Sequence, residues 1–310
     1  MAYVCSIELN GIVVPIVTPV DENEKIDEEK LRKQVNFVIE GGVNGILAFG
    51  SNGEFYVLDE DEMRRGFEIM VDEAKGRVPM FFGIGAIRTS TCIRYAKMAE
   101  ELGADGISVI QPMFLKPTEE ELYQHFKAIA DAVPKLSMLL YNNPGRTGYK
   151  MSTELVGRLA KDVDNIIGMK DSSGDITALS EFIRVTKDLE FSVMGGKDTL
   201  IYPTLAMGGC GAVCSTANIM PELVCGIYKK FIDGDFIGAL DDQYKLNPMR
   251  LSMDLASFPV ATKDMANLRG IDVGAPIRPS LPSSGKVLEK LRQSMVDGGL
   301  INNKLMKGLG

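Results

Sequence analysis

A closed barrel of eight parallel strands, each followed by a helix, is the fold class that the sequence predicts, and three observations predict it. Short apolar runs recur at near-equal spacing, and amphipathic helical patterns fill the intervals between them. The runs are continuous rather than alternating, which is typical of strands buried on both faces, as in parallel sheets. The eight runs are 12–17, 45–50, 79–85, 106–110, 137–143, 165–170, 191–196 and 211–215.

The helical intervals carry start and stop signals. The first helix is expected after Asp27, and the fourth opens with Thr118 and Glu121, the two members of a capping box. Three helices end in glycine immediately before the next strand, in GGVNGI, LGADGI and MGGCGAV. Eight such units fit an α/β fold of the (β/α)8 TIM barrel type, which takes about 250 residues. A doubly wound open sheet is the alternative, but no G-x-G-x-x-G sequence opens the first strand–helix turn.

The strand pattern stops near residue 218, and the remainder of the chain is helical. We therefore predict a catalytic barrel domain over residues 1–233 and a C-terminal helical domain over residues 234–310. Within this helical appendage, the segment VGAPIRPSLPSSG is rich in proline and serine, so we expect an extended loop between two helices.

The composition excludes several classes of partner. The chain has 310 residues, of which 45% are hydrophobic and 25% charged, as is ordinary for a soluble globular protein. Its formal net charge of −8 argues against nucleic acid and membranes, because binding phosphate groups needs concentrated positive charge. The chain has no apolar run of about 18 residues that could span a membrane, and its first residues lack the pattern of a secretory signal. We expect a cytoplasmic protein.

The cysteine and histidine content disfavours metal and triad chemistry. The five cysteines are scattered and odd in number, so we expect reduced thiols rather than a disulfide framework. The only histidine is His125, which removes most Ser/His/Asp triads and multi-histidine metal sites from consideration. We place His125 on the solvated face of a helix whose core face carries Leu122, Phe126, Ile129 and Val133. No metal site is predicted.

Polar residues follow five of the predicted strands. In barrels of this kind the active site is built at the C-terminal ends of the strands, which meet at one mouth. We therefore expect the residues at these ends to converge there: Ser51, Asn52, Tyr141, Arg146, Lys170, Gly196, Lys197, Asp198 and Ser215.

Lys170 is the least ordinary of these residues, because it ends the apolar run NIIGMK without a break. Burial disfavours an ammonium ion, so a lysine placed there can supply a neutral amine. Neutral amines attack ketones and form Schiff bases, which acidify the adjacent carbon. The alternative is a lysine that extends to solvent or pairs with Asp171. The pattern alone leaves both interpretations open.

Several motifs, in this order, resemble the dihydrodipicolinate synthase / N-acetylneuraminate lyase family of class I pyruvate-dependent aldolases. The resemblance covers nearly the whole chain and rests on VPIVTPVDENEKID, GSNGE, YNNPGRTG, IIGMKDSSGD and GGKDTLIYPTLAMGGCGAVCSTANIMPE. It implies a (β/α)8 barrel with a C-terminal helical domain and a homotetramer built as a dimer of dimers. It also implies that neither a metal nor an organic cofactor is needed.

The resemblance implies roles for the residues at the mouth. Lys170 would form the imine with pyruvate or another 2-keto acid, and Tyr141 would transfer protons at the imine and carbon–carbon steps. Ser51 would join that relay, and Ser51 and Asn52 would hold the keto-acid carboxylate. Arg146 would grip the carboxylate of aspartate semialdehyde, as in the synthase branch. Further substrate contacts are expected from Gly196, Lys197, Asp198 and Ser215.

Two departures from the synthase pattern affect the choice of substrate. Ser51 and Asn52 stand where that pattern has two threonines, and Phe114 stands where it has a tyrosine donated across a subunit interface. Phe114 cannot transfer a proton, so we expect it at an interface or site edge. The sequence GSNGEF looks closer to that of family members that cleave 2-keto-3-deoxy sugar acids.

The sequence therefore predicts a Schiff-base-forming lyase that joins or cleaves pyruvate and an aldehyde, most like the dihydrodipicolinate synthase branch. A 2-keto-3-deoxy sugar acid or N-acetylneuraminate-type aldolase is the alternative within the family. A non-catalytic binding protein for keto acids or sugar acids is the alternative of another class.

Overall fold

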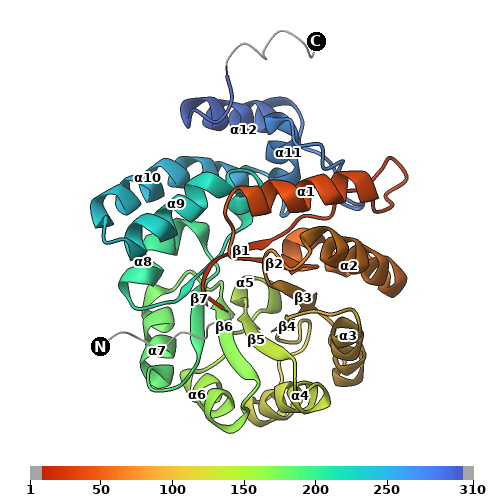
Figure 1. Ribbon diagram of the computed structural model, residues 1–310, viewed down its shortest axis with the longest axis vertical. Helices are drawn as coiled ribbons and strands as arrows, with labels where there is room; N and C mark the ends of the chain where they lie inside the picture. Colours follow the sequence, from red (N-terminus) through yellow and green to blue (C-terminus); the bar gives the residue numbers. More distant parts are fainter. Residues whose placement is uncertain (1–8, 303–310) are drawn as a thin grey trace.

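Eight parallel strands close into a barrel in which each strand pairs with the next along the chain and β8 pairs with β1. The computed structural model describes residues 9–302. Figure 1 shows the strands at the centre of a ring of helices. The barrel prediction is confirmed, and the doubly wound alternative is wrong. The strands are β1 Gly11–Pro15, β2 Gly45–Ala48, β3 Met80–Ile84, β4 Gly106–Ile110, β5 Ser137–Asn142, β6 Ile166–Asp171, β7 Ser192–Gly195 and β8 Gly211–Val213.

Helices begin at the signals that the sequence carries. The Asp27 side chain accepts a hydrogen bond from the Lys30 backbone N–H, and Thr118 and Glu121 form the predicted capping box. The short helix α5, Pro144–Thr147, follows β5 directly. The helices of the ring are α1 Glu28–Glu40, α2 Glu60–Ala74, α3 Thr89–Glu101, α4 Glu119–Ala132, α6 Thr153–Asp162, α7 Ile176–Thr186, α8 Ile201–Ala206 and α9 Pro221–Ile232.

Closure of the barrel depends on glycine at one contact. Gly211 on β8 has φ +155°, and a Cβ atom there would lie 1.9 Å from the Gly11 carbonyl oxygen on β1. Only a residue without a side chain allows the first and last strands to pair this closely. The barrel interior is filled by apolar side chains, among them Leu47, Phe81 and Met194.

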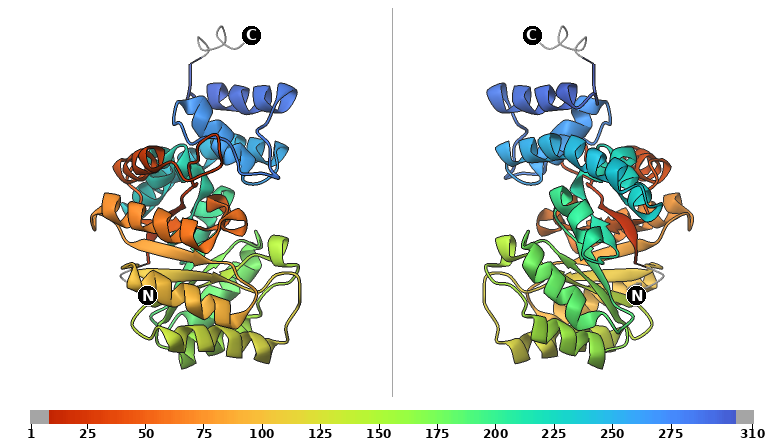
Figure 2. Two further views of the ribbon diagram at one scale, coloured as in Figure 1. Left: turned by 90° about the vertical axis from the view of Figure 1, so that its right-hand side faces the viewer. Right: turned by 90° about the vertical axis from the view of Figure 1, so that its left-hand side faces the viewer.

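The C-terminal helices are α10 Phe236–Ser252, α11 Val260–Arg269 and α12 Gly285–Asp297. Helix α10 lies beside α9, whereas α11 and α12 lie beyond α1 at one end of the molecule (Figures 1 and 2). Residues 270–284 contain no helix or strand, as expected for the proline- and serine-rich loop. The proposed division at residues 233 and 234 falls between α9 and α10.

Two expectations from the sequence are wrong. His125 is buried, at 7% exposure, because α3 contributes Thr89, whose hydroxyl lies 2.9 Å from the His125 Nδ1 atom. The four apolar residues assigned to the core face of α4 are buried as expected. Cys210 is disulfide-bonded, whereas Cys92, Cys214 and Cys225 are free thiols.

Among the described residues, no helix is both long and apolar enough to cross a membrane.

Candidate active site

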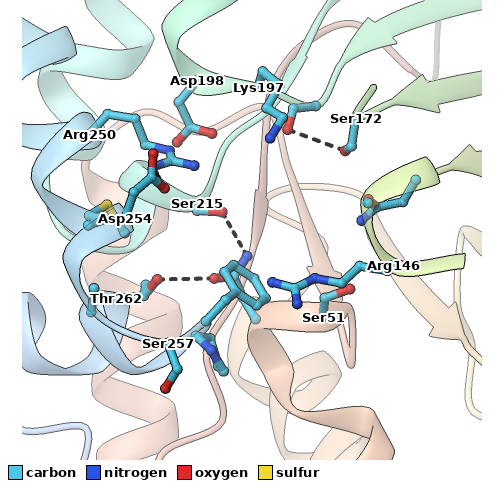
Figure 3. A pocket seen from close by; sticks show the side chains of 18 of the residues that line it. Ser51, Arg146, Ser172, Lys197, Asp198, Ser215, Arg250, Asp254, Ser257 and Thr262 are labelled. Carbon is cyan, nitrogen blue, oxygen red and sulfur yellow. Dashed lines mark hydrogen bonds and ion pairs between the residues drawn. The ribbon is translucent and has the colours of Figure 1, made fainter. Parts of the chain in front are cut away.

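The C-terminal ends of the strands open into a cavity of about 400 Å³. Its wall combines residues that follow the strands with side chains from the C-terminal helices (Figure 3). Nine residues singled out in the sequence line it: Ser51, Asn52, Tyr141, Arg146, Lys170, Gly196, Lys197, Asp198 and Ser215. The residues expected to converge at the mouth of the barrel therefore share one cavity.

Lys170 is buried in the wall of this cavity, at 5% exposure. It lies directly beside Tyr141 in the register of β5 and β6, and its Nζ atom is 4.3 Å from the centre of the Tyr141 ring. The neighbouring Asp171 carboxylate does not pair with it, because its two oxygens accept hydrogen bonds from the side chains of Asn142 and Ser173. Lys170 therefore neither extends into solvent nor pairs with Asp171.

The Tyr141 hydroxyl is the centre of a hydrogen-bond network. The Asn143 Nδ2 atom donates to it at 2.7 Å, and the side chains of Ser51 and Ser172 also hydrogen bond to it. Burial raises the pKa of Tyr141, but the charge of Lys170 and these three hydrogen bonds outweigh burial. The pKa of Tyr141 is therefore below its ordinary value of 10.0, which makes its proton easier to transfer.

Ser51 and Asn52 lie in a 3₁₀ turn, η1 (Ser51–Gly53), immediately after β2. The Asn52 amide is buried and held at both ends. Its Nδ2 atom donates to the Ser215 hydroxyl at 2.8 Å, and its Oδ1 atom accepts from the Thr262 hydroxyl at 3.1 Å. Thr262 belongs to α11, so a C-terminal helix helps to fix this turn.

Arg146 reaches the cavity from α5. Its guanidinium carbon lies 4.9 Å from the centre of the Phe258 ring, a cation–π contact with the C-terminal region. Within residues 9–302, no carboxylate forms an ion pair with Arg146. Arg146 is also exposed. Its hydrogen-bond donors therefore remain available to an anion that enters the cavity.

The segment after β7 forms another part of the wall. A Cβ atom at Gly196 would lie 2.1 Å from the Ser172 hydroxyl oxygen, so a side chain there would displace Ser172, and it would lie 3.1 Å from the Lys170 Cε atom, a tight contact. Asp198 is buried, and its Oδ2 atom accepts hydrogen bonds from the backbone N–H and the hydroxyl of Thr216, at 2.7 and 2.6 Å. Lys197 is exposed beside it.

Phe114 does not line the cavity of its own chain. It lies in the loop between β4 and α4, is 97% exposed, and has a φ of +75°. A large apolar side chain held outward in a left-handed backbone conformation is uncommon.

Several cavity residues were not singled out in the sequence. Asn143 and Ser172 directly follow β5 and β6. The expectation that residues at the C-terminal ends of the strands line the active site could therefore have identified them as well. Arg250, Asp254 and Thr262 belong to the C-terminal helical region, and no strand end points to them. Among the described residues, no group of three or more His, Cys, Asp or Glu side chains is arranged to hold a metal ion.

Known proteins are similar to this chain over nearly its whole length. Residues 8–297 match the dihydrodipicolinate synthetase family. The chain is 36% identical over 284 residues to 4-hydroxy-tetrahydrodipicolinate synthase of Oleidesulfovibrio alaskensis, covering 91% of this chain and 96% of that protein. Dihydrodipicolinate synthase from Thermotoga maritima has a TM-score of 0.92 at 30% identity, covering 95% of this chain and 100% of that one.

A further similar structure is that of YagE, a prophage protein of E. coli K12 solved in complex with pyruvate. It has a TM-score of 0.91 at 29% identity, covering 94% of this chain and 99% of that one. The resemblance seen in the motifs and the predicted class, a carbon–carbon lyase of the class I aldolase type, are confirmed by these relatives. The chain belongs to the dihydrodipicolinate synthetase family.

Proposed function

We propose that this protein joins or cleaves pyruvate, or another 2-keto acid, and an aldehyde through an imine on Lys170. The observation that supports this most strongly is a buried lysine amine 4.3 Å from the Tyr141 ring, at the mouth of the barrel. Barrel enzymes place catalytic groups at this edge. Pyruvate is the ligand named in the YagE complex.

In this reaction the Lys170 amine adds to the C2 carbonyl of pyruvate, and loss of water gives the imine. The imine withdraws electrons, so a proton leaves C3 and an enamine forms. C3 then attacks the aldehyde carbon, and the aldehyde oxygen takes up a proton and becomes a hydroxyl. Hydrolysis of the imine releases the product and restores the amine. Cleavage follows the same steps in reverse.

Tyr141 is the proposed acid and base of these steps. Its ring lies 4.3 Å from the amine and the pKa of its hydroxyl is lowered, so it can give and accept a proton within the cavity. Ser51 and Ser172 hydrogen bond to that hydroxyl and would relay the proton. This arrangement does not require the histidine that most acid–base sites use.

Ser51 and Asn52 are the proposed pocket for the carboxylate of pyruvate. The turn that carries them is held from two sides, by Ser215 after β8 and by Thr262 on α11. A turn fixed in this way presents its donors without losing conformational entropy when the anion binds. Gly196 completes the pocket by leaving room for the imine side chain.

Arg146 is the proposed clamp on the second substrate. Because it has no carboxylate partner among residues 9–302, it can bind a carboxylate on the aldehyde, as in aspartate semialdehyde. This favours the reaction of 4-hydroxy-tetrahydrodipicolinate synthase, the name carried by relatives at 36% and 35% identity. Asn52 and Phe114 favour cleavage of 2-keto-3-deoxy sugar acids, or of an N-acetylneuraminate-type acid, as the second candidate. The pairing of Lys170 with Tyr141 argues against a non-catalytic binder.

The proposed enzyme needs neither a metal nor an organic cofactor, since the imine supplies the electron sink. We further propose that it acts in the cytoplasm as a homotetramer. The fully exposed Phe114 supports contact with a second copy, because burial of such a side chain against a partner is favourable.

Reduction of the imine tests the proposal. The protein is incubated with pyruvate and borohydride, and the modified peptide is identified by mass spectrometry. We expect one adduct, on Lys170, that is absent in Lys170→Ala and still present in Lys197→Ala, which changes the other lysine of the cavity. An unchanged mass, or an adduct on a different lysine, contradicts the proposal.

A further inference from the structure

The cavity contains an arginine–aspartate pair that the barrel strands do not supply. Arg250 lies in the last turn of α10, and Asp254 lies in the short 3₁₀ turn η5 (Met253–Leu255) that follows it. An Arg250 Nη1 atom lies 2.8 Å from the Asp254 Oδ1 atom, and both residues line the cavity that contains Lys170. The C-terminal helical region therefore forms a polar part of the substrate cavity.

Arg250 is charged, and carboxylates balance its charge. Burial lowers the pKa of Arg250, but Asp198 and Asp254 outweigh burial and raise it above the ordinary value. The Arg250 side chain is 18% exposed, whereas that of Asp254, which also lines the cavity, is 64% exposed. Asp198 is held in place by its two hydrogen bonds from Thr216.

The two arginines of the cavity therefore differ in their electrostatic surroundings. Figure 3 shows Arg250 between Asp198 and Asp254, with Arg146 on the opposite side of the view. Arg146 packs on Phe258 and has no carboxylate partner among the residues that the structure describes. An unbalanced arginine attracts an anion, whereas a balanced one does not, because the neighbouring carboxylates repel the same anion.

An arginine–aspartate pair is well suited to hydroxyl groups instead. A hydroxyl is both a donor and an acceptor, while a guanidinium only donates and a carboxylate only accepts. The bond to Asp254 uses one of the five N–H donors of Arg250, so the others can donate to a hydroxyl oxygen. The same hydroxyl, or one on the next carbon, can donate to Asp254.

We infer that Arg250 and Asp254 form a subsite for hydroxyl groups on the aldehyde part of the substrate. The inference rests on the proposed function, because the aldehyde is the partner of the pyruvate imine on Lys170. It deepens the second candidate of the proposed function, in which the second substrate is a polyhydroxy aldehyde, or a hydroxylated 2-keto acid when the bond is cleaved. A carboxylate at the far end of such an aldehyde would bind Arg146.

Two aldehydes of equal chain length test the subsite, with pyruvate as the common partner. D-Glyceraldehyde and propanal differ only in their two hydroxyl groups, and the readout is the ratio of their kcat/KM values. We expect the full-length wild-type protein to prefer glyceraldehyde. The ratio should fall about 10- to 100-fold in Arg250→Met and in Asp254→Asn, since each change removes a hydrogen bond to a charged group.

Arg158→Gln is the matched control, because Arg158 also pairs with a carboxylate, Glu120 at 2.6 Å, but lies outside the cavity. The ratio of kcat/KM for D-glyceraldehyde to kcat/KM for propanal should be the same in Arg158→Gln as in the wild type. Asp254 is exposed, so Asp254→Asn keeps the test informative even if Arg250→Met does not fold. The subsite is overturned if the wild type shows no preference for glyceraldehyde, or if the ratio is unchanged in the folded variants.

Trapping of pyruvate with borohydride separates this inference from the proposed function. An adduct on Lys170 together with an unchanged aldehyde ratio overturns the subsite and leaves the imine chemistry intact. Absence of the adduct in the wild type overturns both. An adduct together with a reduced ratio supports both.

Discussion

Glu54 and Lys263 form an ion pair with 2.6 Å between the Glu54 Oε2 and Lys263 Nζ atoms, and neither side chain is more than 1% exposed. Glu54 follows the turn η1, whereas Lys263 lies on α11, so the pair joins the barrel to the C-terminal helices. The Ile277 backbone N–H donates to Glu54, and Lys263 donates to the Ala275 carbonyl, each at 2.9 Å. This buried network therefore fixes the turn that we propose for carboxylate binding.

Glu54→Gln should destabilise the protein strongly, because it leaves the Lys263 ammonium group buried without a counter-charge. Removal of one partner of a buried pair costs about 3–5 kcal/mol of unfolding free energy. Urea unfolding monitored by circular dichroism measures this cost. The double variant Glu54→Gln/Lys263→Met should recover part of the loss, since it removes the unpaired charge as well. A Glu54→Gln variant as stable as the wild type would show that the pair is unimportant for the fold.

Thr262→Val should weaken pyruvate binding more than turnover. The substitution keeps the shape of the side chain but removes the hydroxyl that donates to Asn52 at 3.1 Å. Loss of one such hydrogen bond corresponds to about a 5-fold rise in KM for pyruvate. Steady-state kinetics at varied pyruvate checks this, and Thr262→Ser should restore the wild-type KM. A fall in kcat with an unchanged KM would contradict the positioning role.

The barrel could be predicted from the sequence because its local signals agree with one another. The strands are continuous apolar runs, glycines end the helices, and caps such as Asp27 begin them. Each strand–helix unit can therefore be recognised from its own local sequence. The position of His125 could not be predicted in the same way. Its burial depends on Thr89, which belongs to the neighbouring helix α3. The periodicity of the α4 sequence does not indicate this contact.

The candidate site likewise contains residues that local sequence signals predict and residues that depend on tertiary packing. Lys170, Tyr141 and Asp198 stand at strand ends, where the barrel rule alone brings them together. Arg250 and Thr262 reach the same cavity only because α10 packs against the turn η3 (Asp198–Leu200) after β7, and α11 against the turn η4 (Ser215–Asn218) after β8. Packing of that kind depends on the tertiary structure, so no motif or spacing in the sequence indicated it.

Tyr141→Phe should separate imine formation from turnover. The substitution removes the hydroxyl but keeps the ring that lies 4.3 Å from the Lys170 amine, so pyruvate should still be trapped by borohydride. Turnover should fall about 10²- to 10⁴-fold, the range for loss of a general acid or base. Tyr244→Phe is the control, since Tyr244 is 63% exposed and does not line the cavity. Retention of wild-type turnover in Tyr141→Phe would exclude Tyr141 as the proton donor.

Arg146→Ala should lower activity on aldehydes that carry a carboxylate. We expect kcat/KM for aspartate semialdehyde to fall about 10- to 100-fold, because a charge-assisted contact is lost. The kcat/KM for acetaldehyde, which has no carboxylate, should change far less. Arg146→Lys keeps the charge without the planar fork, so it should recover only part of the loss. Equal effects of Arg146→Ala on both aldehydes would assign Arg146 a structural role instead.

His125→Gln should change how stability depends on pH. Burial lowers the pKa of His125 from 6.5 to about 4. Above pH 6.5 neither the folded nor the unfolded imidazole is charged, so the folded state has its full stability. As the pH falls from 6.5 toward 4, the unfolded state binds a proton that the folded state does not, and stability is lost.

At pH 5 this loss amounts to about 2 kcal/mol, from about 1.4 kcal/mol for each pH unit below the unfolded pKa. His125→Gln has no imidazole, so its unfolding free energy should fall between pH 7 and pH 5 by about 2 kcal/mol less than that of the wild type. Thr89→Val keeps the buried imidazole and should keep the wild-type dependence. Urea unfolding of the three proteins at both pH values tests this. Parallel behaviour of His125→Gln and the wild type would mean that His125 is protonated in the folded state at pH 5.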